Sequence, residues 1–450
     1  MTTTAQEQSL TTAAAKTVVG SRRHRRAFWA VAFAFLVLMA FSTVPSPLYG
    51  LYRARDHLSL FMVTVVYAVY AVGVIGALLL GGHLSDWYGR RRLLLPALGI
   101  ATLSAIVFLT SKSLSGLIVA RLINGISIGI VPTTATAYLA ELDAVGRPAA
   151  SARKAQLAAS AVSVGGLGIG ALAAGVLAQW APRPLTLVYF VFLAALLLAA
   201  VGVVLAPETR EGPKPRPHYR AQRLSAPHDE RSRFFAAALS AFLAFAAIGL
   251  FTGLAGVFLA GMLHQPSHAL AGAVVGLMFA AGVAAQILTA TWPVTREFEA
   301  GTGVMIIGLG LAVTAVWLHP PTLALFIAGG ALIGAGGGAI FKGAIGTVMN
   351  IARPDQIAES LTGVFLASYV GLSLPVVGAG ITLARHVTPK VTILGFAIAV
   401  TVGITASAIT LVGRTAAPAS AAPTTVATLA EARAIPTQPK GVTKSGRQPE

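Results

Sequence analysis

The sequence predicts an all-α integral membrane protein with twelve transmembrane helices in two pseudo-symmetric six-helix bundles. Hydrophobic residues make up 56% of the 450 residues and charged residues only 11%, whereas a soluble domain carries about 25% charged residues. Apolar runs of the length that crosses a bilayer, about 20 residues, recur along the chain. Lys and Arg gather in alternate loops between these runs, as expected if those loops face the cytoplasm.

The apolar runs define the expected helices, which are residues 27–44, 61–81, 93–110, 114–140, 157–180, 185–206, 234–262, 270–292, 301–318, 321–350, 360–383 and 391–413. The domain organisation that follows is a disordered cytoplasmic N-terminal tail (1–26), an N-terminal six-helix bundle (27–209), a cytoplasmic linker (210–233), a C-terminal six-helix bundle (234–413) and a disordered cytoplasmic C-terminal tail (414–450). Internal symmetry supports two related halves, because Arg121–Gly129 aligns with Gly330–Gly338 in the fourth helix of each half.

Composition excludes several classes of protein. The net charge of +18 lies in tails and alternate loops rather than on one surface, so we expect no nucleic-acid partner. The chain has no cysteine, no group of His, Asp and Glu at metal-ligand spacing, and no glycine-rich loop of the ATP-binding type. We therefore expect neither a metal nor a cofactor.

The stretch Gly82–Arg92 joins two apolar runs as a short and strongly basic turn. Its glycines permit a tight turn and close helix approach, and its three consecutive arginines favour the cytoplasmic side. Asp86 lies four residues before Arg90 and can pair with a neighbouring helix. This spacing is more particular than a loop that only sets topology requires.

The stretch resembles the signature loop between helices 2 and 3 of the major facilitator superfamily of secondary transporters. The pattern Gly-x-Leu-x-Asp-x-x-Gly-Arg-Arg is matched at each core position by Gly82, Leu84, Asp86, Gly89, Arg90 and Arg91. The resemblance extends over about residues 28–414. It implies two six-helix repeats with the substrate path at their interface, and a protein that alternates between inward-facing and outward-facing states.

The resemblance also implies contacts that close and open one side of the transporter. In the family, the loop aspartate contacts the start of helix 11, which places Asp86 near 360–362. A loop arginine pairs with an acid at the end of helix 4, which points to Arg90 with Glu141 or Asp143. These are conformational switch contacts rather than substrate contacts.

Few polar side chains lie inside the expected spans, and each is a functional candidate because polar groups are costly in lipid. Arg121 and Gly125 form an Arg-x-x-x-Gly pattern in the fourth helix. The pattern resembles the one that the superfamily associates with proton coupling or contact with a substrate anion. Tyr67 and Tyr70 share one helix face. The alternatives are that Arg121 extends to the membrane surface and that the tyrosines only pack.

Lys342 and Glu359 are the remaining candidates for the cavity or for coupling. Glu359 begins the eleventh helix and can reach Lys342 across a short loop, so the two predict a charge-paired strut; extension of Lys342 to the membrane surface is the alternative. None of the fifteen acids falls at an expected membrane centre, so the residue that would carry a coupling proton is not visible. The same observation argues against a membrane-embedded enzyme.

Glycines are expected to allow close helix packing at Gly125 and, in the fifth helix, at Gly166, Gly170 and Gly175. Exporters of the drug–proton antiporter type carry Gly-x-x-x-Gly-Pro-x-x-x-Gly in that helix. Here the glycines are present and Ala171 replaces the proline.

We therefore expect a secondary active transporter of small organic molecules that works by alternating access, with efflux as the leading direction. The alternatives are a proton-coupled importer of a sugar or organic acid, and a membrane sensor that keeps the transporter fold. The expected partners are a small-molecule substrate and the lipid bilayer, with a proton as candidate coupling ion. We expect a monomer in the inner or plasma membrane, with both termini cytoplasmic.

Overall fold

The computed structural model describes residues 2–81, 84–111, 113–146, 152–210, 224–227, 230–353 and 356–413, with side chains for all of these except 2–21, 85–86, 152–157 and 412–413. Helices are the only regular secondary structure among the described residues, which contain no strand. They include twelve helical segments long and apolar enough to cross a membrane. The predicted fold class is therefore confirmed.

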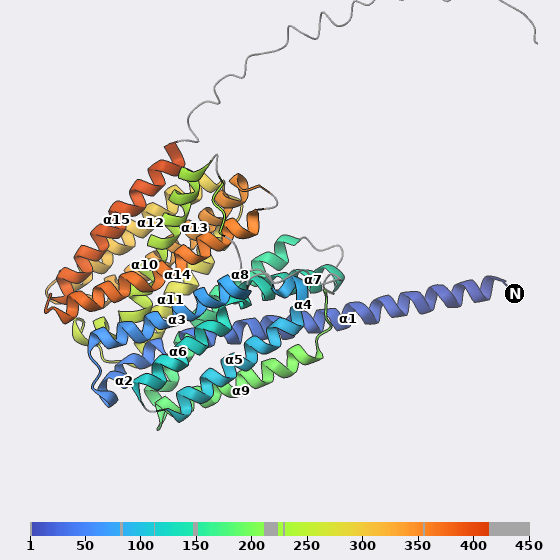
Figure 1. Ribbon diagram of the computed structural model, residues 1–450, viewed down its shortest axis with the longest axis horizontal. Coiled ribbons are helices and arrows are strands. Elements are labelled where there is room, and N and C mark those ends of the chain that lie inside the picture. Colours follow the sequence, from blue (N-terminus) through green and yellow to red (C-terminus); the bar gives the residue numbers. More distant parts are fainter. Residues whose placement is uncertain are drawn as a thin grey trace, which may run out of the picture. The chain divides into compact units, whose positions relative to one another are not determined.

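The N-terminal bundle contains the elements coloured blue to green in Figure 1. They are α1 (Thr2–Thr43), η1 (Ser46–Leu48), α2 (Tyr49–Asp56), α3 (Leu60–Gly81), α4 (Leu84–Tyr88), α5 (Arg90–Thr110), α6 (Leu114–Gly129), α7 (Val131–Gly146), α8 (Ala152–Trp180) and α9 (Pro184–Leu205). α1 ends two residues before Pro45, because proline has no N–H group with which to continue a helix.

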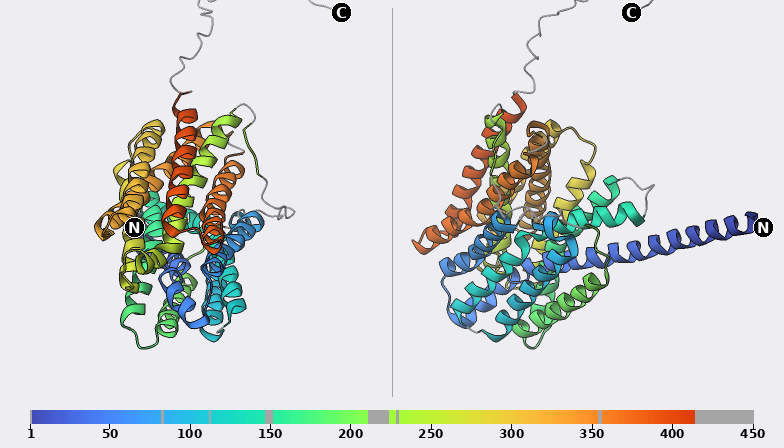
Figure 2. Two further views of the ribbon diagram at one scale, coloured as in Figure 1. Left: turned by 90° about the vertical axis from the view of Figure 1, so that its left-hand side faces the viewer. Right: turned by 45° about the vertical axis from the view of Figure 1, so that its right-hand side comes forward.

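The C-terminal bundle contains the elements coloured yellow-green to red. They are α10 (Arg231–Gly261), α11 (His268–Leu288), α12 (Val294–Trp317), α13 (Leu323–Ile351), α14 (Ile357–Ala384) and α15 (Pro389–Gly413). The views in Figure 2 also show these helices grouped together, beside the N-terminal group.

The three largest differences from the predicted helix boundaries are in α1, in the fourth span and in α12. α1 begins at Thr2 rather than at residue 27. The fourth span reaches Gly146 and is divided at Ile130 into α6 and α7. α12 begins at Val294 rather than at 301, because Pro293 can occupy the cap position just before a first turn. The expected C-terminal tail and most of the expected linker lie outside the described residues.

The two bundles meet along two helix pairs, α8 with α11 and α3 with α14. Small residues allow the first pair to approach closely: a Cβ on Gly175 would come within 2.9 Å of the Gly272 Cα, and one on Gly168 within 3.0 Å of the Gly276 carbonyl oxygen. Because lipid offers no hydrophobic drive for helix association, such close van der Waals packing is the main source of contact energy.

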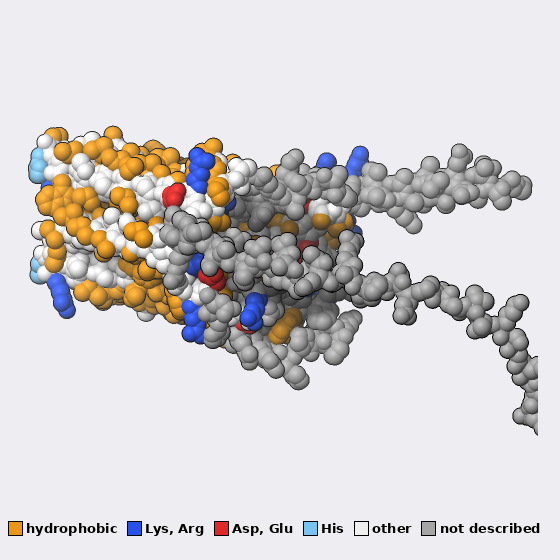
Figure 3. Space-filling view, turned by 90° about the horizontal axis from the view of Figure 1, so that it is seen from above, with side chains coloured by type: hydrophobic (Ala, Val, Ile, Leu, Met, Phe, Trp, Pro, Cys, Tyr) orange, Lys and Arg blue, Asp and Glu red, His pale blue; other side chains and the backbone are white. Residues whose placement is uncertain are grey.

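The surface has the chemistry of a membrane protein. On the face drawn in Figure 3, hydrophobic side chains form a broad band, and most of the visible Lys, Arg, Asp and Glu side chains lie toward one end of it, with a Lys or Arg side chain and His at the other. We call the end of the molecule that holds Gly89–Arg92 the basic end. The opposite end, which holds η1 and α2, we call the far end.

Candidate functional site

A cavity of about 120 Å³ lies between the two bundles. The N-terminal bundle contributes side chains from α1, α3, α6 and α8, and the C-terminal bundle from α10, α11, α13 and α14. The lining includes Arg121, Tyr67 and Tyr70, so the structure brings together three of the predicted candidates. Helix periodicity explains why Tyr67 and Tyr70 both line the cavity, because residues three apart lie on one face of α3.

Arg121 is the one Lys or Arg side chain that lines this cavity, and it is only 1% exposed. Its Nη1 donates to the Ser42 carbonyl oxygen at 2.9 Å, and its Nη2 donates to the Tyr67 carbonyl oxygen at 3.5 Å. Its Cζ lies 4.6 Å from the centroid of the Tyr70 ring. The Nε has no hydrogen-bond partner. The guanidinium therefore stays within the protein instead of extending to the surface.

The remaining cavity wall is largely apolar and aromatic. Phe245 and Phe341 from the C-terminal bundle both line it, with ring centroids 4.9 Å apart. Several hydroxyl groups of the wall are bonded to backbone carbonyls of the protein: Ser42 to Met39 (2.7 Å), Thr43 to Leu167 (2.6 Å) and Thr252 to Ile248 (2.7 Å). These three hydroxyls are therefore engaged as donors, and the other polar side chains of the wall besides Arg121 are those of Ser46, Tyr67, Tyr70, Tyr369 and Gln286.

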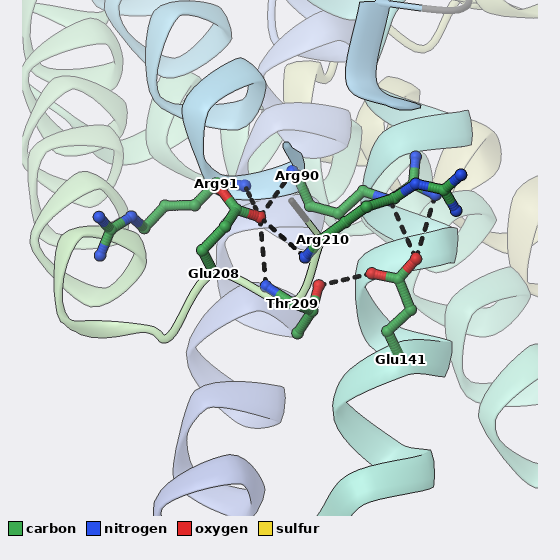
Figure 4. Close-up of polar contacts among 6 residues, drawn as sticks. All are labelled: Arg90, Arg91, Glu141, Glu208, Thr209 and Arg210. Carbon is green, nitrogen blue, oxygen red and sulfur yellow. Dashed lines mark hydrogen bonds and ion pairs between the residues drawn. The ribbon is translucent and has the colours of Figure 1, made fainter. Parts of the chain in front are cut away.

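The signature loop forms a polar cluster with the ends of α7 and α9 (Figure 4). Arg90 Nε and Nη2 donate to Glu141 Oε1 at 3.2 and 3.1 Å. The other Glu141 oxygen accepts a hydrogen bond from the Thr209 hydroxyl. Arg91 Nη1 donates to the Ala206 carbonyl at 3.1 Å. We call the set of Arg90, Glu141, Glu208 and Thr209 the clasp.

Glu208 holds the clasp together through the backbone. Its Oε1 accepts from the N–H groups of Arg90 (2.8 Å) and Arg91 (3.3 Å), and its Oε2 from that of Arg92 (3.3 Å). These are N–H groups at the start of α5 that have no partner within the helix, and a carboxylate there also benefits from the helix dipole. Gly89 makes room: its φ is +102°, and a Cβ would lie 2.6 Å from Glu208 Oε2.

The predicted strut between Lys342 and Glu359 is wrong. The Nζ of Lys342 pairs with Glu297 Oε1 and donates to the Thr289 carbonyl oxygen at 2.7 Å, so its partner is not Glu359. Glu297 falls in the first turn of α12 because that helix begins earlier than predicted, and α12 packs along α13. Glu359 lies half-buried at the start of α14, and no ion pair among the described residues includes it.

The other predicted residues are placed as follows. A Cβ on Gly125 would overlap the Tyr70 carbonyl oxygen, and one on Gly170 that of Ala40. A Cβ on Gly166 would come within 2.8 Å of the Leu36 carbonyl oxygen. Asp143 is buried near the end of α7. Gly82 and the side chain of Asp86 lie outside the described residues, and with them the expected contact to 360–362.

Sequence reasoning missed two acids of these clusters. Glu208 lies just after the sixth apolar run, in the polar stretch Pro207–Arg210, and this position is the sequence signal that could have pointed to it. Its role as a cap on α5 depends on two segments 118 positions apart coming together. The predicted ninth helix begins at residue 301, which leaves Glu297 in a loop, whereas α12 begins at Val294. No pattern marked Phe245 and Phe341, since phenylalanine is common in apolar helices.

Comparisons with known proteins agree with this architecture. The family model described as Major Facilitator Superfamily matches residues 31–374. A crystal structure of a variant of the nucleoside transporter NupG matches with a TM-score of 0.66 at 10% identity, and the match covers 85% of this chain and 99% of that one. At this identity the likeness concerns the fold alone.

Two curated proteins resemble shorter parts of the chain. The arabinose–proton symporter of Bacillus subtilis is 35% identical over 92 residues, which is 20% of this chain and 20% of that protein. The probable glucose transporter rco-3 of Neurospora crassa is 33% identical over 78 residues, 17% of this chain and 13% of that protein. The matched part thus spans a fifth or less of either relative's length.

Proposed function

Since the chain belongs to the Major Facilitator Superfamily, and is a multi-pass membrane transporter of that family, we propose that it moves a small organic solute by alternating access through the cavity that contains Arg121. The observation that carries the proposal is the position of this cavity. It lies between the bundles, and both contribute to its wall. Rocking of one bundle against the other would expose a solute held there to each side of the membrane in turn.

We propose export as the direction of net transport. The wall is mostly apolar, so it suits a solute with an apolar body. Such solutes cross lipid unaided, and a carrier changes their concentration in the cell only by moving them against a gradient. A proton is the proposed coupling ion, and the cell's plasma membrane, with both termini cytoplasmic, is the proposed location.

Import of a sugar together with protons is the second candidate. Its support is the resemblance to proteins named as an arabinose–proton symporter and a probable glucose transporter. The mostly apolar cavity wall argues against it, and the hydroxyls of Ser42, Thr43 and Thr252 donate to backbone carbonyls. Sugar recognition requires many free donors and acceptors to replace the water that the sugar loses.

The test uses the absence of cysteine from the native chain. Gln179 on α8 and Ser267 at the start of α11 lie in contact at the far end, with Gln179 Oε1 3.2 Å from Ser267 Oγ. We would replace both with cysteine, cross-link them with a short bis-maleimide, and measure solute exchange in proteoliposomes. Cross-linking should stop exchange, and each single-cysteine variant serves as a control.

Exchange at an undiminished rate in fully cross-linked protein would contradict alternating access. Direction is read separately, from net flux in vesicles of one orientation under an imposed proton gradient. Uptake driven by inward proton flow would favour the importer. A ligand that stabilises the protein but never crosses the membrane would identify a sensor instead.

A further inference from the structure

Arg121 carries a charge that the protein does not neutralise. Within the part of the chain that the structure describes, no carboxylate ion pair involves Arg121, whereas Arg55, Arg90, Arg233 and Lys342 each have one. Two backbone carbonyls and the faces of Tyr67 and Tyr70 lie near the guanidinium. A guanidinium has five donors; Nη1 and Nη2 each donate one N–H to these carbonyls and keep a second, and the buried Nε has no partner.

A buried and unpaired cation is energetically unfavourable unless something compensates it. The cation–π contacts and the hydrogen bonds to the Ser42 and Tyr67 carbonyls offset the desolvation of this charge only in part, because no opposite charge is paired with it. The arrangement thus leaves a site of positive potential in a cavity wall. The chemical group that best matches a guanidinium with free donors is a planar oxyanion, which can bind through two parallel hydrogen bonds.

The C-terminal side of the cavity adds the second element of recognition. Phe245 and Phe341 contact each other, and Phe341 also contacts Phe365 at a centroid distance of 5.8 Å. Aromatic rings arranged in this way favour stacking or edge contacts with another ring or a branched apolar group. Ile248, Met278 and Leu372 extend the same apolar wall.

The size of the cavity limits the ligand. Its volume is about 120 Å³, near the roughly 150 Å³ of an engineered apolar cavity that binds benzene. A molecule with a single ring is therefore of the right size for this state of the protein.

From these three observations we infer that the solute is a small monocarboxylate with an aromatic or compact apolar body, its carboxylate on Arg121 and its body against Phe245 and Phe341. The inference rests on the proposed function of the same cavity and names its substrate class. Such acids cross lipid in their neutral form and accumulate inside as anions, which makes an exporter useful.

The experiment compares benzoate with its neutral isostere benzamide. Binding is measured by thermal stabilisation of the purified protein, which rises with ligand concentration relative to Kd. Exchange is measured with radiolabelled benzoate in proteoliposomes. We expect benzoate to bind the native protein at least about tenfold more tightly than benzamide, since hydrogen bonds to charged groups are the stronger ones.

The variants are Arg121→Gln and, as a matched control, Arg183→Gln, which removes an exposed arginine at the far end. Arg121→Gln should weaken benzoate binding about 10- to 100-fold and leave benzamide binding unchanged. Arg121→Lys should retain part of the affinity. Equal benzoate affinity in the Arg121→Gln and Arg183→Gln proteins would overturn the inference.

A second measurement separates a binding role from a structural one. If the role of Arg121 is to bind a ligand, the ligand-free Arg121→Met protein should have the same Tm as the native protein or a higher one, because an unpaired buried charge is removed. A lower Tm together with unchanged benzoate binding would overturn the inference. Phe341→Leu should lower affinity for benzoate more than for an aliphatic acid of similar size; equal loss would overturn the aromatic part.

The outcomes also distinguish this inference from the proposed function. Exchange of another solute, such as glucose, with no effect of benzoate would overturn the substrate class and leave the transporter mechanism standing. Benzoate binding that depends on Arg121, without exchange of any solute, would support the site and contradict transport.

Discussion

At the basic end, the N-terminal half joins α5 to α7 through Arg90 and Glu141, and the C-terminal half joins α12 to α13 through Glu297 and Lys342. Both ion pairs connect the start of the third span of a half to its fourth span. The charges are exchanged: the third span carries the cation in the first half and the anion in the second.

The two joints also differ in their surroundings. In the clasp, the Glu141 side chain is 28% exposed, and Glu208 adds a third segment through the N–H groups of α5. In the second half, the Glu297 side chain is only 3% exposed, and Lys342 reaches the C-terminal end of α11 at the Thr289 carbonyl. The buried partner is thus the cation in the clasp, where Arg90 is 7% exposed, and the anion in the second half, where Lys342 is 30% exposed. We infer that the second joint contributes to stability by compensating the buried Glu297, whereas the clasp, which joins the signature loop to two other segments, is suited to opening and closing.

The largest expected effect is that of Glu297→Ala. It leaves Lys342 without its carboxylate in a partly buried site, and loss of one partner of a buried pair costs about 3 kcal/mol or more. Thermal unfolding in detergent measures it, with Glu299→Ala, an exposed acid of the same helix, as control. Similar small shifts in Tm for both variants would mean that the buried Glu297 pair adds nothing to stability.

Gly89→Ala should have the next largest effect and acts on the clasp. A side chain is strained at a φ of +102°, and its Cβ would lie 2.6 Å from Glu208 Oε2. We expect a loss of about 2 kcal/mol, measured in the same assay. Gly99→Ala in α5 is the control: its Cβ would meet nothing within 4 Å, so alanine there should stabilise by about 0.5 kcal/mol. Equal effects would refute the close fit of Gly89 and Glu208.

The smallest effect is expected for Glu208→Gln. The amide can still accept hydrogen bonds from the start of α5, but the negative charge at the helix N-terminus is lost, worth about 0.5–1 kcal/mol. Transport should change more than stability, because the clasp would be easier to open. The control is Glu230→Gln, which removes an exposed acid near Arg233. Unchanged exchange rates would contradict a role for the clasp in the transport cycle.

The sequence was sufficient for the architecture because apolar length and alternate basic loops are direct consequences of the bilayer. It also identified Arg121, Tyr67 and Tyr70 as candidates, since any polar group in a span is conspicuous. The pairing of Arg90 with Glu141 was one of the two options that the family resemblance left open.

The misplaced partners share one cause. Closeness in sequence predicts Glu359 as the partner of Lys342, whereas helix packing brings Glu297 to it from a preceding helix. A boundary error of seven residues in α12 then hid Glu297 in a loop. Glu208 illustrates the same limit, because a cap from a distant segment leaves no local pattern around the helix that it caps.

The central claim is that the two bundles move reciprocally around the Arg121 cavity. Its most direct test is the distance between spin labels on cysteines introduced in pairs, Val145→Cys with Met349→Cys at the basic end and Arg183→Cys with His319→Cys at the far end, all at exposed positions. We predict that a transported ligand or the Glu208→Gln change lengthens one distance while shortening the other. Distances that stay fixed, or that lengthen together, while solute is being exchanged would contradict the account.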